Sequence, residues 1–202
     1  VSTGDWRGYA DSAIRALRQA AARQPAAMDK ARALTADLET EADRVRAVRD
    51  FLVRSIRLAG PALDEVPFSA ITPADKILAE GYGSSADRAV LFYAMLRALR
   101  LRPAFVLASR ASRVEAHQRP LREMPDPSWF GEVLVQVRAG EADVVLNDTD
   151  QYAALGATPH HGRPGLVAGG GIISIQAPEV LQDRSEVAYR VRVEPGGDAV
   201  IE

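Results

Sequence analysis

The sequence predicts an α+β fold in which N-terminal helices pack against an antiparallel sheet. Up to about residue 99, apolar residues recur at three- and four-residue steps, the period of amphipathic helices. From residue 103 onward the pattern changes to short apolar or β-branched runs that are separated by turn sequences. Helices that precede the strands, rather than alternating with them, are typical of the α+β class.

Composition narrows the functional classes. The chain has 202 residues, a formal net charge of −2 and no cysteine. The lack of cysteine excludes thiol nucleophiles, disulfides and thiolate metal sites. The small net charge creates no field that favours nucleic acid, and no apolar run reaches the roughly 18 residues that span a bilayer. We therefore expect no nucleic-acid partner and no membrane contact by this segment. Because the sequence begins without Met, we also expect it to be part of a longer protein.

Residues 6–58 are expected to form three helices. The first ends at Pro25, and the second is expected over residues 28–38. Thr40 is the expected N-cap of the third, with Asp43 placed to close its first turn. The arginines of this third helix are expected to lie on its solvated face: Arg44, Arg46, Arg49 and Arg54.

Two further helices are expected before the strands. Thr72 followed by proline predicts the start of a short helix that ends at Gly81. Ser84 and Asp87 then predict the start of a central helix, because a hydroxyl at the N-cap and an acid three residues later satisfy free backbone N–H groups. Its core-facing residues recur with helical spacing: Phe92, Met95, Leu96 and Leu99.

The second half predicts a meander of strands. Strands are expected at 103–109, 130–138 and 142–147, with a hairpin turn at 139–141. Further strands are expected at 172–176, 186–193 and 199–201. We predict a core domain over residues 1–165, with its central part at 72–156, and a β-rich extension over residues 166–202 that begins or joins a following β-domain.

Three stretches, in order, resemble the transglutaminase-like superfamily, whose members have a papain-like fold. The first is ADKILAEGYGSSADRAVLFYAMLRALRLRPAFVLA, residues 74–108. It resembles a short helix, a Tyr-Gly-Asp-Cys-x-Asp motif, a long apolar helix and a strand. The second, residues 129–137, resembles the strand that carries the catalytic His. The third, VLNDTDQYAALG at 145–156, resembles the strand end that carries the catalytic Asp. The bacterial envelope proteins of this superfamily are the most similar branch.

The resemblance implies a degenerate catalytic triad. Ser85 stands at the Cys position, Glu132 at the His position and Asn147 at the Asp position. A carboxylate is a poor base for a serine hydroxyl, and Asn147 cannot stabilise a cation as an aspartate does. The family frame is otherwise kept at Tyr82, Gly83, Asp87, Phe130 and Thr149. The expected cleft residues are Tyr82, Gly83, Ser84, Asp87, Trp129, Phe130 and Asp148.

The function that follows is a catalytically inactive domain that binds a peptide, a protein or adjacent domains of the same chain. The alternative is a Ser/Glu-based amidase or protease, which requires a raised pKa for Glu132 and a closed, dry pocket. A third reading is a purely structural spacer. The family resemblance also suggests a periplasmic or cell-envelope location.

Other readings of the polar residues are weaker. Asp87 and Glu132 could form a carboxylate pair for glycoside hydrolysis, and Asp148, Thr149 and Asp150 could bind a hard cation together with Glu132. The histidines are expected to be exposed loop residues: His117, His160 and His161. Gly169–Gly171 lacks the context of a phosphate loop and predicts a linker or tight turn. No metal site and no cofactor are expected.

Overall fold

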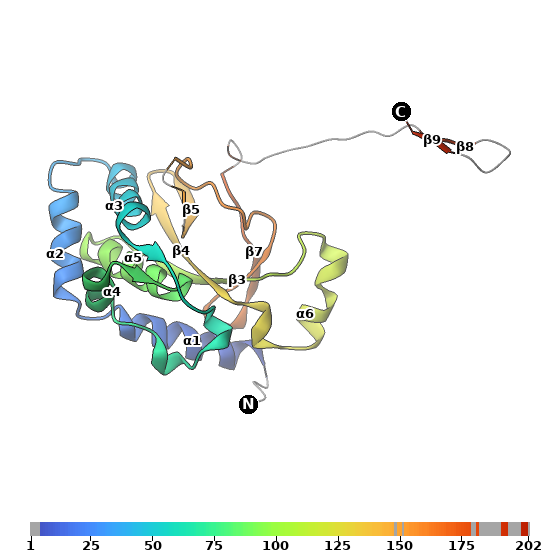
Figure 1. Cartoon of the computed structure of the whole chain (residues 1–202), viewed down its shortest axis with the longest axis horizontal. Helices are drawn as coiled ribbons and strands as arrows, with labels where there is room; N and C mark the ends of the chain where they lie inside the picture. The colour runs from blue at the N-terminus through green and yellow to red at the C-terminus, as the bar shows by residue number, and fades with distance from the viewer. Residues whose placement is uncertain are drawn as a thin grey trace.

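The protein has an α+β fold in which N-terminal helices pack against a five-stranded antiparallel sheet (Figure 1). The computed structural model describes residues 5–147, 149–150, 152–178, 181, 191–193 and 199–201. The predicted fold class and layer arrangement are confirmed. Asp148 lies outside the described residues, as does much of the strand predicted at 186–193.

Six α-helices lie in the described part of the chain, joined by short 3₁₀ turns. They are α1 (Trp6–Ala20), α2 (Pro25–Leu34), α3 (Glu41–Ser55), α4 (Ala74–Glu80), α5 (Ser85–Ala98) and α6 (Arg119–Glu123). The 3₁₀ turns are η1 (Leu63–Glu65), η2 (Phe68–Ala70), η3 (Glu115–Gln118), η4 (Pro127–Trp129) and η5 (Ala168–Gly170). Among the described helices, none is both long and apolar enough to cross a membrane.

The main sheet has the strand order β5-β4-β3-β6-β7, and all neighbours are antiparallel. Its strands are β3 (Ala104–Ala108), β4 (Glu132–Ala139), β5 (Ala142–Leu146), β6 (Pro164–Leu166) and β7 (Ile172–Ser174). Two short pairs lie outside this sheet: β1 (Arg57–Leu58) with β2 (Tyr82–Gly83), which are parallel, and β8 (Val191–Val193) with β9 (Ala199–Ile201). β6 and β7 carry the sheet past residue 166, and the predicted domain boundary at 165 stays a prediction.

Helix α5 lies at the centre of the core. It packs against α2, α3 and α4 on its outer side and against β4 on its inner side. Its buried residues surround the helix rather than forming one stripe, as expected for a helix enclosed on several sides. The face of β4 that meets it consists of Val133, Val135 and Val137. The opposite face of the sheet has its own apolar cluster around Val106, Leu134 and Val145.

The predicted helix starts are mostly confirmed. Thr40 Oγ1 accepts the N–H of Asp43, and Ser84 and Asp87 form a reciprocal capping box at the start of α5. Gly81 ends α4 with φ 70°, a left-handed conformation that glycine adopts without strain. The prediction for Thr72 was wrong. The N-cap of α4 is Pro73, whose side chain has no hydrogen-bond acceptor, and the N–H of Thr72 donates to Asp87.

Arg49 contradicts the predicted solvated face of α3. Its side chain is 4% exposed, lies 2.7 Å from a carboxylate oxygen of Asp50 and donates to the backbone carbonyl of Ala153. Arg46 and Arg54 do lie on the surface, where they pair with Asp43 and Asp50. Arg49 therefore fastens the segment after β5 to the helical layer.

Gly169–Gly171 forms a tight turn against α1, which confirms the prediction. Gly169 and Gly170 have φ of 81° and 80°, and the N–H of Gly169 donates to Asp11 of α1. A Cβ atom at Gly170 would lie 2.5 Å from the backbone nitrogen of Arg7. The close approach of the two backbones thus requires glycine at this position.

Candidate functional site

The first residue of α5, the start of β4 and the end of β5 come together at one point. The capping box places Ser85 as the first residue of α5. Ser85 Oγ accepts a hydrogen bond of 3.1 Å from the main-chain N–H of Val133. Asn147, directly after β5, reaches the same residue. Ser85 and Asn147, two of the three positions that the family resemblance assigns to a triad, are therefore neighbours, although they are 62 residues apart in the chain.

Asn147 acts as a clamp between the helix and the strand. Its Nδ2 donates to the carbonyl oxygen of Ser85 at 2.9 Å and to that of Val133 at 2.8 Å. A longer contact of 3.3 Å joins the same nitrogen to Ser85 Oγ. The two amide hydrogens are thus used by two backbone carbonyls. We call this group of Ser85, Val133 and Asn147 the amide clamp.

Glu132 points away from the amide clamp. Successive side chains of a strand face opposite sides of the sheet, and Val133 faces α5. Glu132 therefore lies on the same side as Leu134, where both line one hollow. Its carboxylate oxygen Oε2 lies 3.2 Å from Nε2 of His160. Among the described residues, Ser85 has no carboxylate or imidazole within hydrogen-bond distance of its hydroxyl.

The pKa of Glu132 lies below its ordinary value of 4.5. The main cause is the hydrogen bond from His160, and the positive charges of His160, Arg110 and Arg163 add to it. Partial burial of the carboxyl acts in the opposite direction and does not prevail. Arg110 also pairs with Asp64 across Gly131, where a Cβ atom would collide with the guanidinium. The glycine before Glu132 therefore lets this ion pair lie against the start of β4.

His160 was wrongly expected to be an exposed loop residue. Its side chain is only 12% exposed, and its Nδ1 is buried with no hydrogen-bond partner among the described residues. His161 is half-buried, and its Nδ1 accepts the N–H of Ala177. His117 is exposed, as predicted. The Glu132–His160 pair joins residues 28 positions apart through a loop, and no local spacing in the sequence predicts it.

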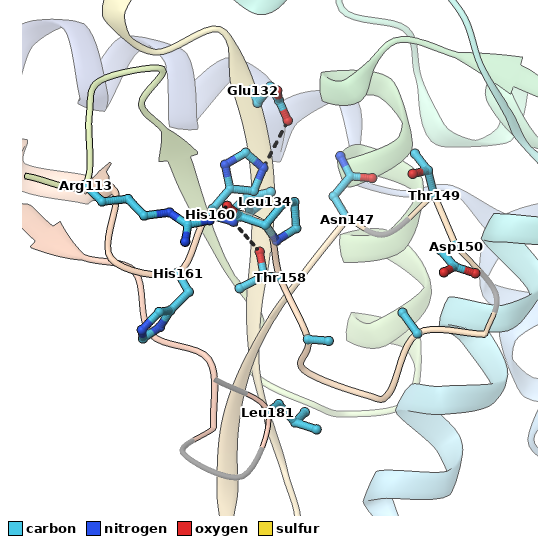
Figure 2. Close-up of a pocket in the computed structure, with 13 residues that line it drawn as sticks. Arg113, Glu132, Leu134, Asn147, Thr149, Asp150, Thr158, His160, His161 and Leu181 are labelled. Atoms are coloured by element: carbon cyan, nitrogen blue, oxygen red, sulfur yellow. Dashed lines mark hydrogen bonds and ion pairs between the residues drawn. The ribbon is translucent and has the colours of Figure 1, made fainter. Parts of the chain in front are cut away.

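The hollow beside this pair has a volume of about 550 Å³ and is called the large hollow (Figure 2). Figure 2 shows Glu132 and His160 joined on one side, with Asn147, Thr149 and Asp150 on the other. Its polar lining consists of Arg113, Glu132, Asn147, Thr149, Asp150, Thr158, His160 and His161. Asn147 is the one member of the amide clamp in this lining.

Four of the predicted cleft residues lie at a second hollow of about 260 Å³, called the Tyr82 hollow. It is lined by Tyr82, Gly83, Ser84 and Asp87 and by apolar residues of the segment 59–71. Tyr82 is 47% exposed at its rim. The predicted single cleft is therefore replaced by two hollows, and Ser85 belongs to the lining of neither.

Two of the predicted cleft residues belong to the core side. Phe130 is fully buried and meets Trp6 edge to face, with ring centroids 5.0 Å apart. Trp129 is half-buried and packs against the same core. Both lie on the side of the sheet that carries α1, which prevents Phe130 from lining a cleft.

The glycosidase reading finds no support in the geometry, and the cation reading finds none among the described residues, which do not include Asp148. Asp87 already accepts from the N–H of Thr72, the N–H of Ser84 and the hydroxyl of Ser84, and it lines a different hollow from Glu132. Within the described residues, no group of three or more His, Cys, Asp or Glu side chains is arranged to hold a metal ion. Thr149 and Asp150 are exposed at the rim of the large hollow.

Comparison with known proteins supports the fold and leaves the family open. No protein-family model matches the sequence, and no curated protein sequence matches it. The fold is similar to the crystal structure of a protein from Parabacteroides distasonis described as a putative protease, with a TM-score of 0.63. The two chains are 15% identical, and the match covers 85% of this chain. It spans 31% of that solved chain, so this chain corresponds to about a third of the solved protein, and the likeness is one of fold alone.

Proposed function

We propose that this chain is a catalytically inactive transglutaminase-like domain that binds a peptide or a partner protein domain. The amide clamp is the observation that carries the proposal. In a working enzyme of this kind, the three positions would hold a thiolate, an imidazole and a carboxylate that exchange protons. Here a hydroxyl and a neutral amide occupy two of them, and both are engaged with backbone groups.

The environment of Glu132 argues against the Ser/Glu-based alternative. A carboxylate that takes a proton from serine near neutral pH needs a raised pKa. The pKa of Glu132 is lowered instead, and its side chain is 48% exposed and engaged with His160. The open, polar large hollow beside it also differs from the closed, dry pocket that this chemistry requires.

The two hollows favour binding over a purely structural spacer. A spacer has no need to keep hollows of about 550 and 260 Å³ on either side of its former reaction centre. The large hollow offers charged groups of both signs, whereas the Tyr82 hollow is mainly apolar. Such a combination suits a peptide segment with mixed side chains. A location in the cell envelope, next to other domains of a longer chain, belongs to the same proposal.

Activity-based labelling tests the loss of catalysis. We expect a fluorophosphonate probe to leave the protein unlabelled, because among the described residues no base accepts the proton of Ser85. We also expect no ammonia release from glutamine peptides. The Ser85→Ala variant serves as the control for labelling at other sites. Labelling that disappears in Ser85→Ala would refute the inactive state.

Peptide selection tests binding. Random peptides displayed on phage should yield binders whose affinity falls when the large hollow is filled by Ala157→Trp, since Ala157 lies in its lining. Ala33→Trp, at an exposed position of α2 away from the hollows described, is the matched control. Failure to select binders, or binders indifferent to Ala157→Trp, would leave the spacer reading as the better one.

A further inference from the structure

A third hollow, of about 330 Å³, lies away from the candidate site and is lined by residues of α1, of the turn between α1 and α2, of the start of α2 and of the end of α5. Its lining combines Arg18, Arg23 and Arg97 with Met28, Tyr93 and four alanines. We call it the arginine hollow. The three arginines come from three different elements: α1, the turn after it, and α5. Among the described residues, no carboxylate lines this hollow.

The three arginines have no ion-pair partner within the described part of the chain. This contrasts with Arg32, Arg46 and Arg119, which each pair with a carboxylate on their own helix. Cations that share one hollow repel one another, and an anion in that hollow relieves the repulsion. The lining therefore has the charge of an anion site in a protein whose net charge is −2.

Helix dipoles explain only part of this arrangement. Arg18 and Arg97 lie in the last turns of α1 and α5, where a cation is favoured by the helix C-terminus. Arg23 lies outside any helix and has φ 54°, in the left-handed region. A glycine would adopt that conformation without strain, whereas an arginine does so at a conformational cost. The helix dipoles therefore do not account for the third cation, Arg23, in its left-handed backbone conformation.

The apolar part of the lining constrains the ligand further. Met28 and the alanines provide a surface without charge, and Tyr93 lies stacked on Phe105, with ring centroids 4.3 Å apart. A bare inorganic ion would leave this surface in water, whereas a molecule with an apolar group would cover it. We propose that the arginine hollow binds a small anion that carries an apolar group, such as an aromatic phosphate ester. This site is independent of the proposed function.

Phenyl phosphate is a suitable probe, with inorganic phosphate and phenol as its two halves. In titrations followed by amide chemical shifts, phenyl phosphate should produce saturable shifts at residues 18–28 and 93–98. Inorganic phosphate should bind more weakly, and phenol should leave these amides unchanged. Equal affinity for inorganic phosphate or for phenol would overturn the ligand class, and no saturable shift with phenyl phosphate at millimolar concentration would overturn the site.

Arg23→Gly separates binding from stability. The variant removes one cation and relieves the backbone, so we expect affinity for phenyl phosphate to fall by about 3- to 10-fold, with no loss of thermal stability. Arg97→Gln should weaken binding to a similar degree. Arg100→Gly is the matched control, because Arg100 also has a positive φ, of 64°, yet does not line the hollow. Unchanged affinity in both Arg23→Gly and Arg97→Gln, or an equal loss in Arg100→Gly, would contradict the proposal.

Discussion

The amide clamp and the Glu132–His160 pair lie at the same end of β4, yet they differ in almost every physical respect. The clamp joins neutral groups at the packed junction of α5, β4 and β5, and each of its amide hydrogens meets a carbonyl oxygen. The Glu132–His160 pair joins titratable groups across the wall of the large hollow, and Glu132 is 48% exposed. The two arrangements lie on opposite faces of β4, because Glu132 and Val133 are consecutive and successive side chains of a strand face opposite sides of the sheet.

This difference follows from the groups that each face of β4 meets. A neutral amide is suited to a position between two backbone carbonyls, because it brings two donors and no charge to be desolvated. A carboxylate at the same place would face two oxygen atoms of like polarity. The titratable groups lie instead on the opposite face, where His160 and the neighbouring arginines stabilise the negative charge of Glu132.

Asn147→Asp restores the aspartate that the family resemblance implies, and it should be the most damaging change. The new carboxylate would lose both hydrogen bonds to the carbonyls of Ser85 and Val133 and would be repelled by them. We expect a loss of about 3 kcal/mol in the free energy of unfolding near neutral pH, measured by urea denaturation. Because protonation removes the repulsion and returns one donor, part of the loss should be recovered in acid.

Gln118→Glu is the control for this change. Gln118 also donates to two backbone carbonyls, those of Ser112 and Arg113, but at an exposed position. There, water replaces the lost hydrogen bonds, and we expect a loss below about 0.5 kcal/mol. Equal effects of Asn147→Asp and Gln118→Glu would show that the clamp is no more than a surface contact.

Asp87→Ala removes the anchor that holds the start of α5. Asp87 accepts from the N–H of Thr72, the N–H of Ser84 and the hydroxyl of Ser84, at distances of 2.8, 3.0 and 3.0 Å. Loss of these partly buried hydrogen bonds should cost about 2–3 kcal/mol in urea denaturation. Asp126→Ala removes a carboxylate that accepts the N–H of Ser128 at the surface and should cost well under half as much.

Ser85→Ala tests whether the serine hydroxyl is structural. The variant leaves the N–H of Val133 without its acceptor, and we expect a cost of about 1–2 kcal/mol. Ser112→Ala is the matched control, since Ser112 Oγ accepts the N–H of Val114 at the same distance of 3.1 Å but in solvent. A Ser85→Ala protein as stable as the wild type would mean that this hydroxyl is free for another role.

Much of the fold could be predicted from the sequence because the local signals for helix starts, strands and turns agreed with one another. The capping pairs Thr40–Asp43 and Ser84–Asp87 act within one helical turn, so they could be predicted correctly without knowledge of the tertiary structure. Strands β3, β4, β5 and β7 were found because their apolar runs are short and bounded by turns, whereas β6, which is only three residues long and contains Pro164 and Gly165, was not predicted. The fold class followed from the order of these elements.

The burial of Arg49 shows a signal that was present and misread. Val45, Val48, Arg49 and Leu52 have the spacing of a single buried helix face, and all four are buried. The orientation of Glu132 was also readable, because the alternation of Val133, Val135 and Val137 assigns those residues to α5 and Glu132 to the other face. The partner of Glu132 was not readable, since loop geometry brings His160 to it from 28 positions away.

Glu132→Gln should have the smallest effect and the clearest pH dependence. The pKa of Glu132 is lowered in the folded protein, so the pair stabilises the fold above the ordinary carboxyl pKa and this contribution is lost as the pH falls through the folded pKa. Because Glu132 is half exposed, we expect the variant to lose less than about 1 kcal/mol near pH 6 and a smaller amount near pH 3. Glu123→Gln, which breaks the more exposed Arg119 pair, should change stability less at both pH values. If the wild type instead became more stable relative to Glu132→Gln as the pH falls, the pKa of Glu132 would be raised in the folded protein. The Ser/Glu chemistry requires such a raised pKa, and this result would support it.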